Sequence, residues 1–453
     1  MDNREASTIV ALSTPRGHGG IAVVRLSGDR SLSIAQNIFT SVKNVLNGKT
    51  VYGKIFDENG FIDTAILTYY KAPNSYTGED VVEISHHGNP FLSDLIIDAC
   101  KYHGASGAHP GEFTKRAFLN GKMDLSQAEG VADIIYSDSR AALEASTNLL
   151  DGIVGKTFRK IKSEILDILT VAELELDFLE DEISRTSPAE NIMKISSVID
   201  TIDTMLMTYD YGKIIRGGIR CPIVGPPNSG KSSLFNALLQ EERVIVSSQP
   251  GTTRDFIEES IRVGDYQIRL IDTAGIRDSA NEIESAGIKK SKTLLDEGDM
   301  LLYIIDPADQ AFKIRNFSPP VLKKIVFIIN KSDISTDTQI QRIKTKVKNF
   351  PHFVCSAKKH FGIHEIALGI IARFDALKPS STTVILTRQR HKEALSSAKS
   401  FLVKAVLSIS EKTPPEVYAI DLRESLDHID TILGKTTNDD ILNNIFSNFC
   451  IGK

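Results

Sequence analysis

Eight consecutive residues, Gly225-Pro226-Pro227-Asn228-Ser229-Gly230-Lys231-Ser232, fit the phosphate-binding pattern G-x-x-x-x-G-K-[ST]. The glycines let the backbone wrap a phosphate, and successive N–H groups then point inward as an anion nest. Lys231 would place its charge on the β- and γ-phosphates, and the Ser232 hydroxyl would ligate Mg²⁺. From Ser233 to residue 239 an apolar run predicts a helix whose N-terminus faces the phosphates. Because all fixed positions are filled, the pattern predicts a nucleotide site.

Four more short motifs follow in the order that a P-loop GTPase requires. They are Gly251-Thr252-Thr253-Arg254-Asp255, Asp272-Thr273-Ala274-Gly275, Asn330-Lys331-Ser332-Asp333 and Ser356-Ala357-Lys358. The first is typical of switch I, with Thr253 as a second Mg²⁺ ligand, and the second is typical of switch II. The last three follow strand-like runs. Each motif alone is often only a polar loop, but five in this order predict a G domain.

The third of these motifs selects the base. A carboxylate such as that of Asp333 can accept hydrogen bonds from the N1–H and N2–H groups of guanine. Adenine lacks both donors, so the motif indicates GTP rather than ATP.

Composition limits the class of protein. The chain has 453 residues, which suggests roughly three domains, and its formal net charge is −5. No strongly basic face is expected from this balance, so a partner would share the binding of an RNA substrate. Cys100, Cys221, Cys355 and Cys450 are far apart and form no C-x-x-C pair, which argues against zinc and a disulfide framework. No signal-peptide core or membrane-length apolar run is found, so a cytoplasmic protein is expected.

Hydrophobic periodicity predicts an α/β plus α protein. Residues 1–120 alternate strands (8–12, 21–26, 65–70, 81–85) with helices (30–39, 90–102), and residues 216–378 read as a G domain with a mostly parallel sheet. Residues 121–215 and 379–453 are helical. The economical arrangement is one helical bundle interrupted by the G domain. Ser126-Gln127-Ala128-Glu129 predicts a capping box, and Pro222 is placed at the start of its strand.

Two clusters outside these motifs could suggest a metal. His86 and His87 are adjacent in a turn, a spacing that does not easily bring both rings to one ion, so a hydrogen-bonded role is favoured. The acidic residues between 173 and 182 are read as a solvated helix face and loop. No catalytic constellation is evident in residues 1–120.

Several stretches outside the G motifs resemble one family, the tRNA modification GTPases called MnmE or TrmE. The resemblance covers essentially the whole chain. It is carried by Thr8-Ile9-Val10-Ala11, Gly19-Gly20-Ile21, the segment 75–80 (SYTGED), the segment 110–120 (PGEFTKRAFLN) and the tail Phe449-Cys450-Ile451-Gly452-Lys453.

The resemblance implies a tetrahydrofolate-binding-like N-terminal domain that forms a homodimer and holds 5-formyltetrahydrofolate as the one-carbon source. The matching positions for this ligand are Arg25, Glu83, Lys122 and Lys453. It also implies an FAD-binding partner of the MnmG or GidA kind, in a heterotetramer. The complex would install an aminomethyl-type group on C5 of the wobble uridine of tRNA, and GTP hydrolysis would drive a conformational cycle.

The resemblance also implies how GTP is hydrolysed. Many small GTPases place a glutamine after the Asp-Thr-Ala-Gly motif to orient water, but Ile276 stands there. Potassium would replace an arginine finger, with Asn228 as its side-chain ligand. Ser247-Ser248-Gln249-Pro250 and Thr252 match the loop that closes over the ion, although many relatives carry an acidic residue in that loop. Glu284 matches the residue that orients the attacking water through a second water.

Two other functions fit parts of the sequence. A ribosome-assembly GTPase that binds RNA would carry the same G motifs, but such proteins usually add a basic domain. A folate-dependent methyltransferase regulated by GTP would need catalytic residues in residues 1–120. Binding of a reduced folate would separate these possibilities.

Overall fold

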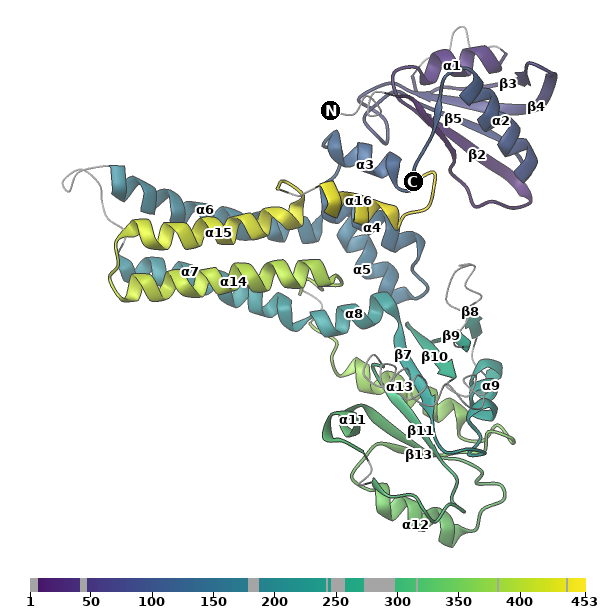
Figure 1. Cartoon of the computed structure of the whole chain (residues 1–453), viewed down its shortest axis with the longest axis vertical. Coiled ribbons are helices and arrows are strands. Elements are labelled where there is room, and N and C mark those ends of the chain that lie inside the picture. Colours follow the sequence, from purple (N-terminus) through teal and green to yellow (C-terminus); the bar gives the residue numbers. More distant parts are fainter. Residues whose placement is uncertain are drawn as a thin grey trace, which may run out of the picture. The chain divides into compact units, whose positions relative to one another are not determined.

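The computed structural model describes residues 7–40, 47–177, 187–241, 243–245, 257–272, 298–314, 317–380, 383–436 and 439–453. The chain forms two compact units, shown with their elements in Figure 1. The N-terminal unit comprises Met1–Ala132, Leu149–Ser163 and Leu426–Lys453, and the second unit comprises Asp133–Asn148 and Glu164–Ser425.

A six-stranded sheet forms the centre of the N-terminal unit, in the order β3-β4-β5-β2-β1-β6. Its strands are β1 (Ile9–Leu12), β2 (Gly19–Ser27), β3 (Thr50–Asp57), β4 (Gly60–Tyr70), β5 (Val81–Gly88) and β6 (Ser106–Gly107). Helices α1 (Ser31–Ile38) and α2 (Pro90–Tyr102) pack against the sheet. The resulting core contains Val24 and Leu26 of β2 and Ile96 of α2. The four predicted strands and both helices are confirmed. The sequence missed β6, which has two residues, and the edge strand β3, whose apolar pattern Gly53 interrupts.

Two of the family-like stretches hold each other in this unit. Helix α3 (Glu112–Leu119) carries Arg116, which forms ion pairs with Glu79 at 3.1 Å and Glu112 at 2.8 Å and donates to Ser7 O. The Arg116 side chain is only 8% exposed, and its two carboxylate partners are partly buried. Asn120 Nδ2 also donates to the Thr77 carbonyl at 2.8 Å. Segments 75–80 and 110–120 are therefore held together by these polar contacts.

The capping box predicted at Ser126 to Glu129 is wrong, because both residues lie inside α4 (Leu125–Ile135). The box lies two residues earlier. The Asp124 carboxylate accepts from Gln127 N at 2.9 Å, and Gln127 Oε1 accepts from Asp124 N at 3.1 Å. Aspartate caps a helix as well as serine does, so the residue type alone did not fix the start.

Helix α16 (Asp439–Ser447) completes the N-terminal unit. The spacing of Ile441, Ile445 and Phe449 predicts that all three face the core. Phe449 is buried and Ile445 packs against the core, but Ile441 is 43% exposed. Leu442 and Phe446 are buried as well. These side chains pack against α4 in one apolar cluster, together with Phe449. The last helix is thus packed against α4 almost to the end of the chain.

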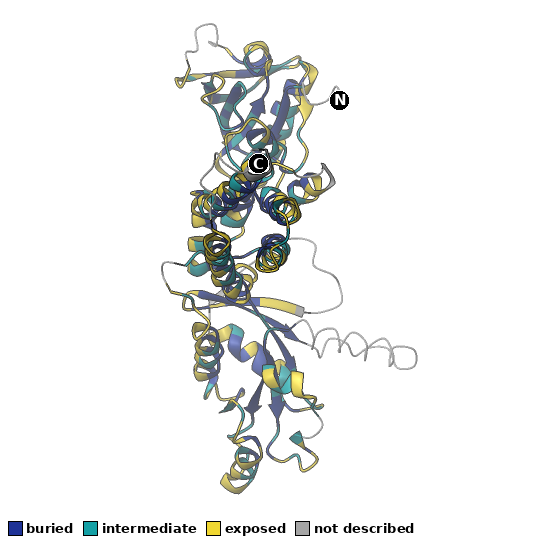
Figure 2. Ribbon diagram, turned by 90° about the vertical axis from the view of Figure 1, so that its left-hand side faces the viewer, coloured by how far each residue is buried: buried dark blue, intermediate teal, exposed yellow. Residues whose placement is uncertain are grey.

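The second unit contains a seven-stranded sheet, in the order β13-β12-β11-β7-β10-β9-β8. Its strands are β7 (Ile219–Val224), β8 (Arg243–Ile245), β9 (Ile257–Val263), β10 (Tyr266–Asp272), β11 (Leu301–Ile305), β12 (Ile325–Ile329) and β13 (His352–Val354). Its helices are α9 (Lys231–Glu241), α11 (Pro319–Lys324), α12 (Asp337–Val347) and α13 (Ile363–Asp375). Strands β13 to β10 run parallel, and the β9–β10 pair is the predicted antiparallel hairpin. Figure 2 shows that buried residues are concentrated along these strands.

Pro222 lies within β7 rather than at its start, so that placement is wrong. It pairs with Ile271 of β10, whereas the ladder to β11 begins one residue later, at Ile223. The central strand accommodates the proline because the second ladder starts beyond its missing N–H.

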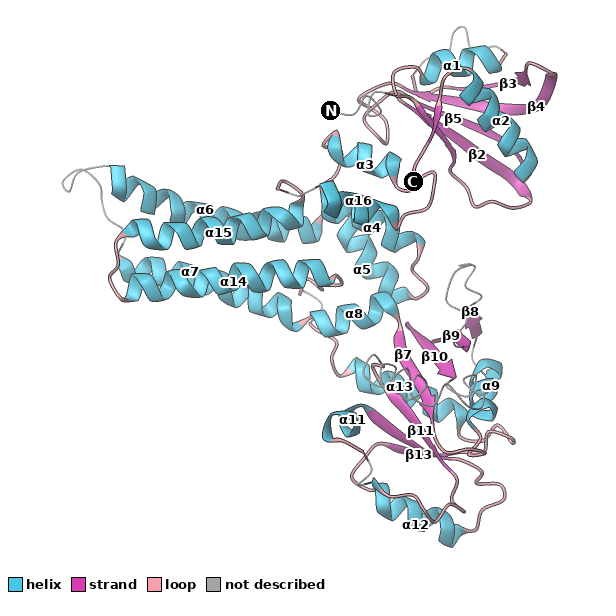
Figure 3. Cartoon of the chain, viewed as in Figure 1, coloured by secondary structure: helices cyan, strands magenta, loops and turns pink. Residues whose placement is uncertain are grey.

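Some helices of the second unit precede the strands of its sheet along the chain, and others follow them. Helix α8 (Tyr209–Gly217) leads into the sheet, and α7 (Pro188–Met207) packs side by side with α14 (Gln389–Ser410), as Figure 3 shows. An ion pair between Lys399 and Asp203 at 2.5 Å joins this pair. The apolar stripe of α14, formed by Leu395, Ala398, Leu402, Ala405 and Ile409, is buried along its length. Helices α5 (Arg140–Leu150), α6 (Ile153–Asp177) and α15 (Pro415–Leu433) complete the helical set; none of the described helices is long and apolar enough to cross a membrane.

Replacing Arg116 with methionine should destabilise the N-terminal unit by about 3–5 kcal/mol, because two partly buried carboxylates would lose their buried cation. Urea unfolding of the full chain, followed through the transition of this unit, measures the loss. Arg16→Met is the matched control, since Arg16 pairs with Asp94 on an exposed surface of the same unit and should cost well under about 1 kcal/mol. Equal losses of unfolding free energy for the two variants would show that the Arg116 network does not stabilise the unit.

Candidate functional site

The phosphate-binding loop connects β7 to α9, which begins at Lys231 and confirms the predicted helix. Gly225 has a φ of 155°, Asn228 a φ of 60° and Gly230 a φ of 98°, so three residues of the loop have positive φ. A Cβ on Gly230 would lie 2.2 Å from Asn330 Nδ2. Glycine is therefore required at this position by both backbone conformation and space.

Two side chains of the loop are placed for phosphate and metal. Lys231 Nζ donates to Gly225 O at 3.1 Å and to Pro226 O at 3.0 Å, which folds the ammonium back over the loop. Ser232 Oγ donates to Asp272 Oδ2 at 3.1 Å, and Asp272 is 5% exposed. A hydroxyl and a carboxylate at this separation are oxygen donors of the kind that Mg²⁺ prefers next to nucleotide phosphates. Ser233 follows in the first turn of α9.

Asn330, only 2% exposed, joins the three loops of the site. Its Nδ2 donates to Ser229 O in the phosphate loop at 3.0 Å, and its Oδ1 accepts from Ala357 N at 3.0 Å. Cys355 Sγ contacts the same oxygen at 3.6 Å. The asparagine of the base motif thus fixes the phosphate loop and the Ser356–Lys358 loop at once.

Asp333 is exposed at the rim of the site, where a base could reach it. Ser356 Oγ donates to its Oδ1 at 2.7 Å. That hydrogen bond lowers the pKa of Asp333, and the positive charge of Lys358 acts in the same direction. The carboxylate therefore stays ionised at neutral pH and remains an acceptor for guanine N–H groups.

The middle residues of the base motif shape its loop. Lys331 has a φ of 61°, and its Nζ donates to Asp306 Oδ2 at 2.8 Å. Ser332 N donates to Cys355 O at 3.1 Å. These bonds hold the loop in the bend that presents Asp333.

The remaining predicted residues of the G site lie outside the described residues and stay predictions. They are Ser247, Ser248, Gln249, Pro250, Gly251, Thr252, Thr253, Thr273, Ala274, Gly275 and Glu284.

The β9–β10 hairpin connects the two switch segments in sequence and contacts the helices, which the sequence did not predict. Gln267 Nε2 donates to Asp138 Oδ2 at 3.2 Å, and Arg262 Nε donates to Asp138 O at 3.1 Å. At the hairpin tip, Ala141 N in α5 donates to Asp265 O at 3.4 Å. No sequence signal marked Asp138, because it follows α4 in an ordinary polar turn. The strand that ends at Asp272 is therefore tied to α5.

A second cluster of predicted site residues lies in the N-terminal unit. Arg25 and Glu83 are paired across β2 and β5, with Nη2 and Oε1 2.7 Å apart. The guanidinium lies 5.4 Å from the ring centroid of Tyr76 and 5.7 Å from that of Phe113. An ion pair flanked by two aromatic rings suits a flat heteroaromatic ligand with an N–H edge.

The C-terminal tail is docked on this unit. Ile451 forms a β-bridge with Pro110, and Gly111 N donates to Cys450 O at 3.3 Å. Ser13 Oγ donates to Gly452 O at 3.1 Å. Gly452 has a φ of 95°, and a Cβ there would lie 2.1 Å from Leu12 O, so only glycine fits. These contacts hold the tail in one fixed place.

Docking brings Lys453 to the Arg25–Glu83 pair. Burial lowers the pKa of the Lys453 ammonium, as does the nearby charge of Arg25, while Glu83 opposes the shift. Gly452 lies against Leu12 of β1, next to Ala11, which pairs with Arg25. Three of the four predicted folate residues therefore lie within electrostatic range of one another. Lys122 has different contacts: its Nζ donates to Pro73 O at 3.0 Å.

The cysteines and histidines fall into structural roles. Burial raises the pKa of the Cys100 and Cys355 thiols to about 12, and it also raises that of Cys221, whereas Cys450 is exposed. His87 Nδ1 contacts Asp63 at 2.8 Å, as expected for a hydrogen-bonded histidine. Among the described residues, no three His, Cys, Asp or Glu side chains gather as a metal-binding set.

Comparison with known proteins adds a further finding. The family described as "GTP-binding protein TrmE N-terminus" matches residues 8–122, and the family described as "MnmE helical domain" matches residues 125–450. The tRNA modification GTPase MnmE of Aquifex aeolicus is 38% identical over 451 residues, covering 98% of this chain and 99% of that protein. MnmE of Clostridioides difficile is 36% identical over 457 residues, with the same coverage. Among solved structures, the G domain of the T. maritima FeoB iron transporter covers 35% of this chain and 98% of its own, with 22% identity and a TM-score of 0.26.

Asp333→Asn should weaken GTP binding by roughly 10- to 100-fold, because hydrogen bonds to charged groups contribute about 1.5–3 kcal/mol. Xanthosine triphosphate should bind better than GTP, since the new amide can donate to the second carbonyl of xanthine. Titration with labelled nucleotides measures both affinities. Asp337→Asn makes the same charge change at the exposed start of α12 and should leave GTP affinity unchanged. Undiminished GTP affinity in Asp333→Asn would contradict the assignment.

Proposed function

The chain belongs to the MnmE family of tRNA modification GTPases and is a GTP hydrolase, and on that premise we propose its reaction. It acts as the GTP-hydrolysing subunit of a complex that installs an aminomethyl-type group on C5 of the wobble uridine of tRNA, with a carbon derived from 5-formyltetrahydrofolate. The observation that supports this proposal is the docked C-terminal tail, which brings Lys453 within electrostatic range of the Arg25–Glu83 ion pair. The same chain carries the guanine motifs, which Asn330 joins to the phosphate loop.

The guanine site supplies most of the hydrolytic machinery. Lys231 neutralises phosphate charge, and Ser232 with Asp272 fits Mg²⁺, to which Thr253 would add an oxygen. A potassium ion would supply the positive charge that an arginine finger supplies elsewhere. Asn228, on left-handed backbone at the mouth of the loop, would ligate it together with Ser247, Gln249 and Thr252. Glu284 would orient the attacking water.

The contacts of the β9–β10 hairpin would couple the nucleotide-bound state of the G domain to the helices. Asp272 ends β10 beside the metal position, and Gln267 on the same strand donates to Asp138. A displacement of the switch segments at either end of the β9–β10 hairpin would therefore be transmitted to α5. This supports a conformational cycle driven by GTP hydrolysis.

The N-terminal cluster fits the folate. Glu83 can accept from the pterin N–H edge, and the rings of Tyr76 and Phe113 border the same space. Arg25 and Lys453 suit the formyl oxygen or the glutamate tail. Lys122 contacts other residues and would join only through a long ligand.

The proposed assembly follows from the family. We expect a tetrahydrofolate-binding-like domain in residues 1–120 that forms a homodimer, and a cytoplasmic heterotetramer with an FAD-binding partner that acts on tRNA. The G domain, residues 216–378, would be inserted into a helical domain of residues 121–215 and 379–453. The packing of α7 on α14 supports this insertion. Family membership favours tRNA modification over ribosome assembly.

GTP turnover should rise well over tenfold when potassium replaces sodium, because a charge that replaces an arginine finger contributes about 10³–10⁵ in rate. Phosphate release in matched salts measures this. Asn228→Ala should flatten the difference by removing the side-chain ligand. Equal wild-type rates in the two salts would contradict the potassium site.

Gly452→Ala should release the tail from Leu12 and abolish tRNA modification, since a Cβ has no space and φ is positive. GTP turnover should stay within about twofold, because the G site lies in the other unit. Nucleoside analysis of tRNA and phosphate release measure the two activities.

Gly17→Ala is the matched control for this experiment, because a Cβ on Gly17 would meet no atom within 4 Å. It should leave both activities unchanged. Normal tRNA modification by Gly452→Ala would show that the docked tail is ordinary surface.

A further inference from the structure

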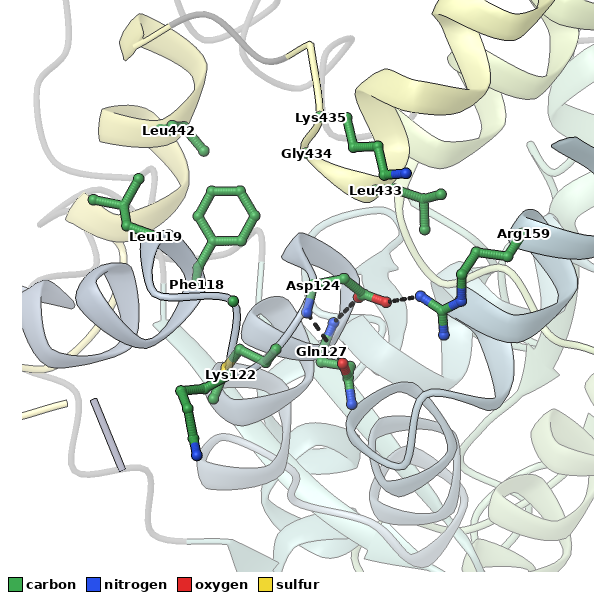
Figure 4. A pocket seen from close by; sticks show the side chains of 12 residues that line it. Phe118, Leu119, Lys122, Asp124, Gln127, Arg159, Leu433, Gly434, Lys435 and Leu442 are labelled. Atoms are coloured by element: carbon green, nitrogen blue, oxygen red, sulfur yellow. Dashed lines mark hydrogen bonds and ion pairs between the residues drawn. The ribbon is translucent and has the colours of Figure 1, made fainter. Parts of the chain in front are cut away.

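A pocket of ≈ 690 Å³ in the N-terminal unit lies outside the G motifs and shares only Lys122 with the residues matched to the folate (Figure 4). Its walls come from three segments far apart in sequence: the end of α3 with the loop to α4, the first turns of α6, and the end of α15 with the start of α16. Only folding brings these segments together. The lining contains none of Arg25, Glu83 and Lys453.

Positive charge dominates the polar side of this pocket. Lys122, Arg159 and Lys435 line it, and all three are exposed. The one carboxylate in the lining, Asp124, is already engaged, because it caps α4 and pairs with Arg159 Nη1 at 2.7 Å. Arg159 keeps further N–H donors beyond that single bond. In a chain of net charge −5, this is a local site for an anion.

The opposite side is apolar. Phe118, Leu119, Leu433 and Leu442 line it, and Leu119 is 54% exposed. Figure 4 shows the Phe118 ring near Leu119 and Leu442. A free phosphate would pair with the cations but leave the apolar wall exposed to solvent. A ligand with a phosphate and a flat ring uses both sides.

We propose that this pocket binds one nucleotide of the substrate RNA, with its phosphate on Lys435 and Arg159 and its base against Phe118 and Leu119. The inference rests on the proposed function, in which the substrate is tRNA. Recognition of RNA commonly combines cations on the backbone with an unstacked base against an aromatic side chain. A protein with no overall basic face needs such a local contact.

The test is tRNA binding by the full-length Lys435→Glu variant. The probe is a fluorescent, unmodified tRNA transcript with uridine at the wobble position, measured by anisotropy between about 50 and 200 mM salt. The variant should bind at least roughly tenfold more weakly, as expected for one lost charge-assisted contact. Its plot of log affinity against log salt should be shallower by about one unit.

Lys194→Glu is the matched control, because it makes the same charge change on an exposed face of α7 outside the pocket. It should bind tRNA like the wild type, and GTP turnover should be unchanged in both variants. Equal tRNA affinity and salt slope in Lys435→Glu and wild type would overturn the proposal. So would unchanged tRNA binding with weaker binding of a polyglutamylated reduced folate, which would assign the pocket to the folate tail.

Failure of the wild type to bind the transcript even at the lowest salt would also overturn the pocket assignment. The proposed function stands or falls separately, on whether the wild-type chain supports wobble-uridine modification.

Discussion

The nucleotide site depends on one buried amide, the side chain of Asn330. Its two ends bond Ser229 O in the phosphate loop and Ala357 N in the loop after β13, so three loops share one fixed geometry. Leaving such a buried group unpaired would cost about 1–3 kcal/mol. The same amide occupies the space where any Cβ on Gly230 would lie, which explains the glycine. The positions of the phosphate loop and the base-recognition loops are therefore fixed by the same side chain.

A second constraint links chemistry to the rest of the chain. Strand β10 carries Asp272 at one end, beside Ser232, and Gln267 and Tyr266 toward the other. Gln267 bonds Asp138, and Tyr266 bonds Tyr211 at the start of α8 and Asp375 at the end of α13. One strand thus contacts the phosphate loop through Asp272 and contacts α8 and α13 through Tyr266. In the N-terminal unit the docked tail has the equivalent role, because it carries Lys453 to Arg25 and Glu83.

Much of this could be predicted from the sequence, because the decisive signals are local. The phosphate loop, α9, the parallel strands and the β9–β10 hairpin follow from short motifs and periodicity. Partners across long separations left no such signal: Asp138 meets Gln267 across 129 residues, and Arg116 meets Ser7 across 109. Equivalent residue types also misled, since Asp124 rather than Ser126 caps α4.

The most direct test of the account is the content of modified wobble uridine in tRNA from cells whose only copy of this protein carries Asn330→Ala. Protein levels must be matched to the wild type by immunoblot. The account predicts loss of the modification, because the phosphate loop and the base loops would no longer be fixed together and GTP could not drive the cycle. Modification at the wild-type level would contradict the claim that the assembled guanine site controls the reaction.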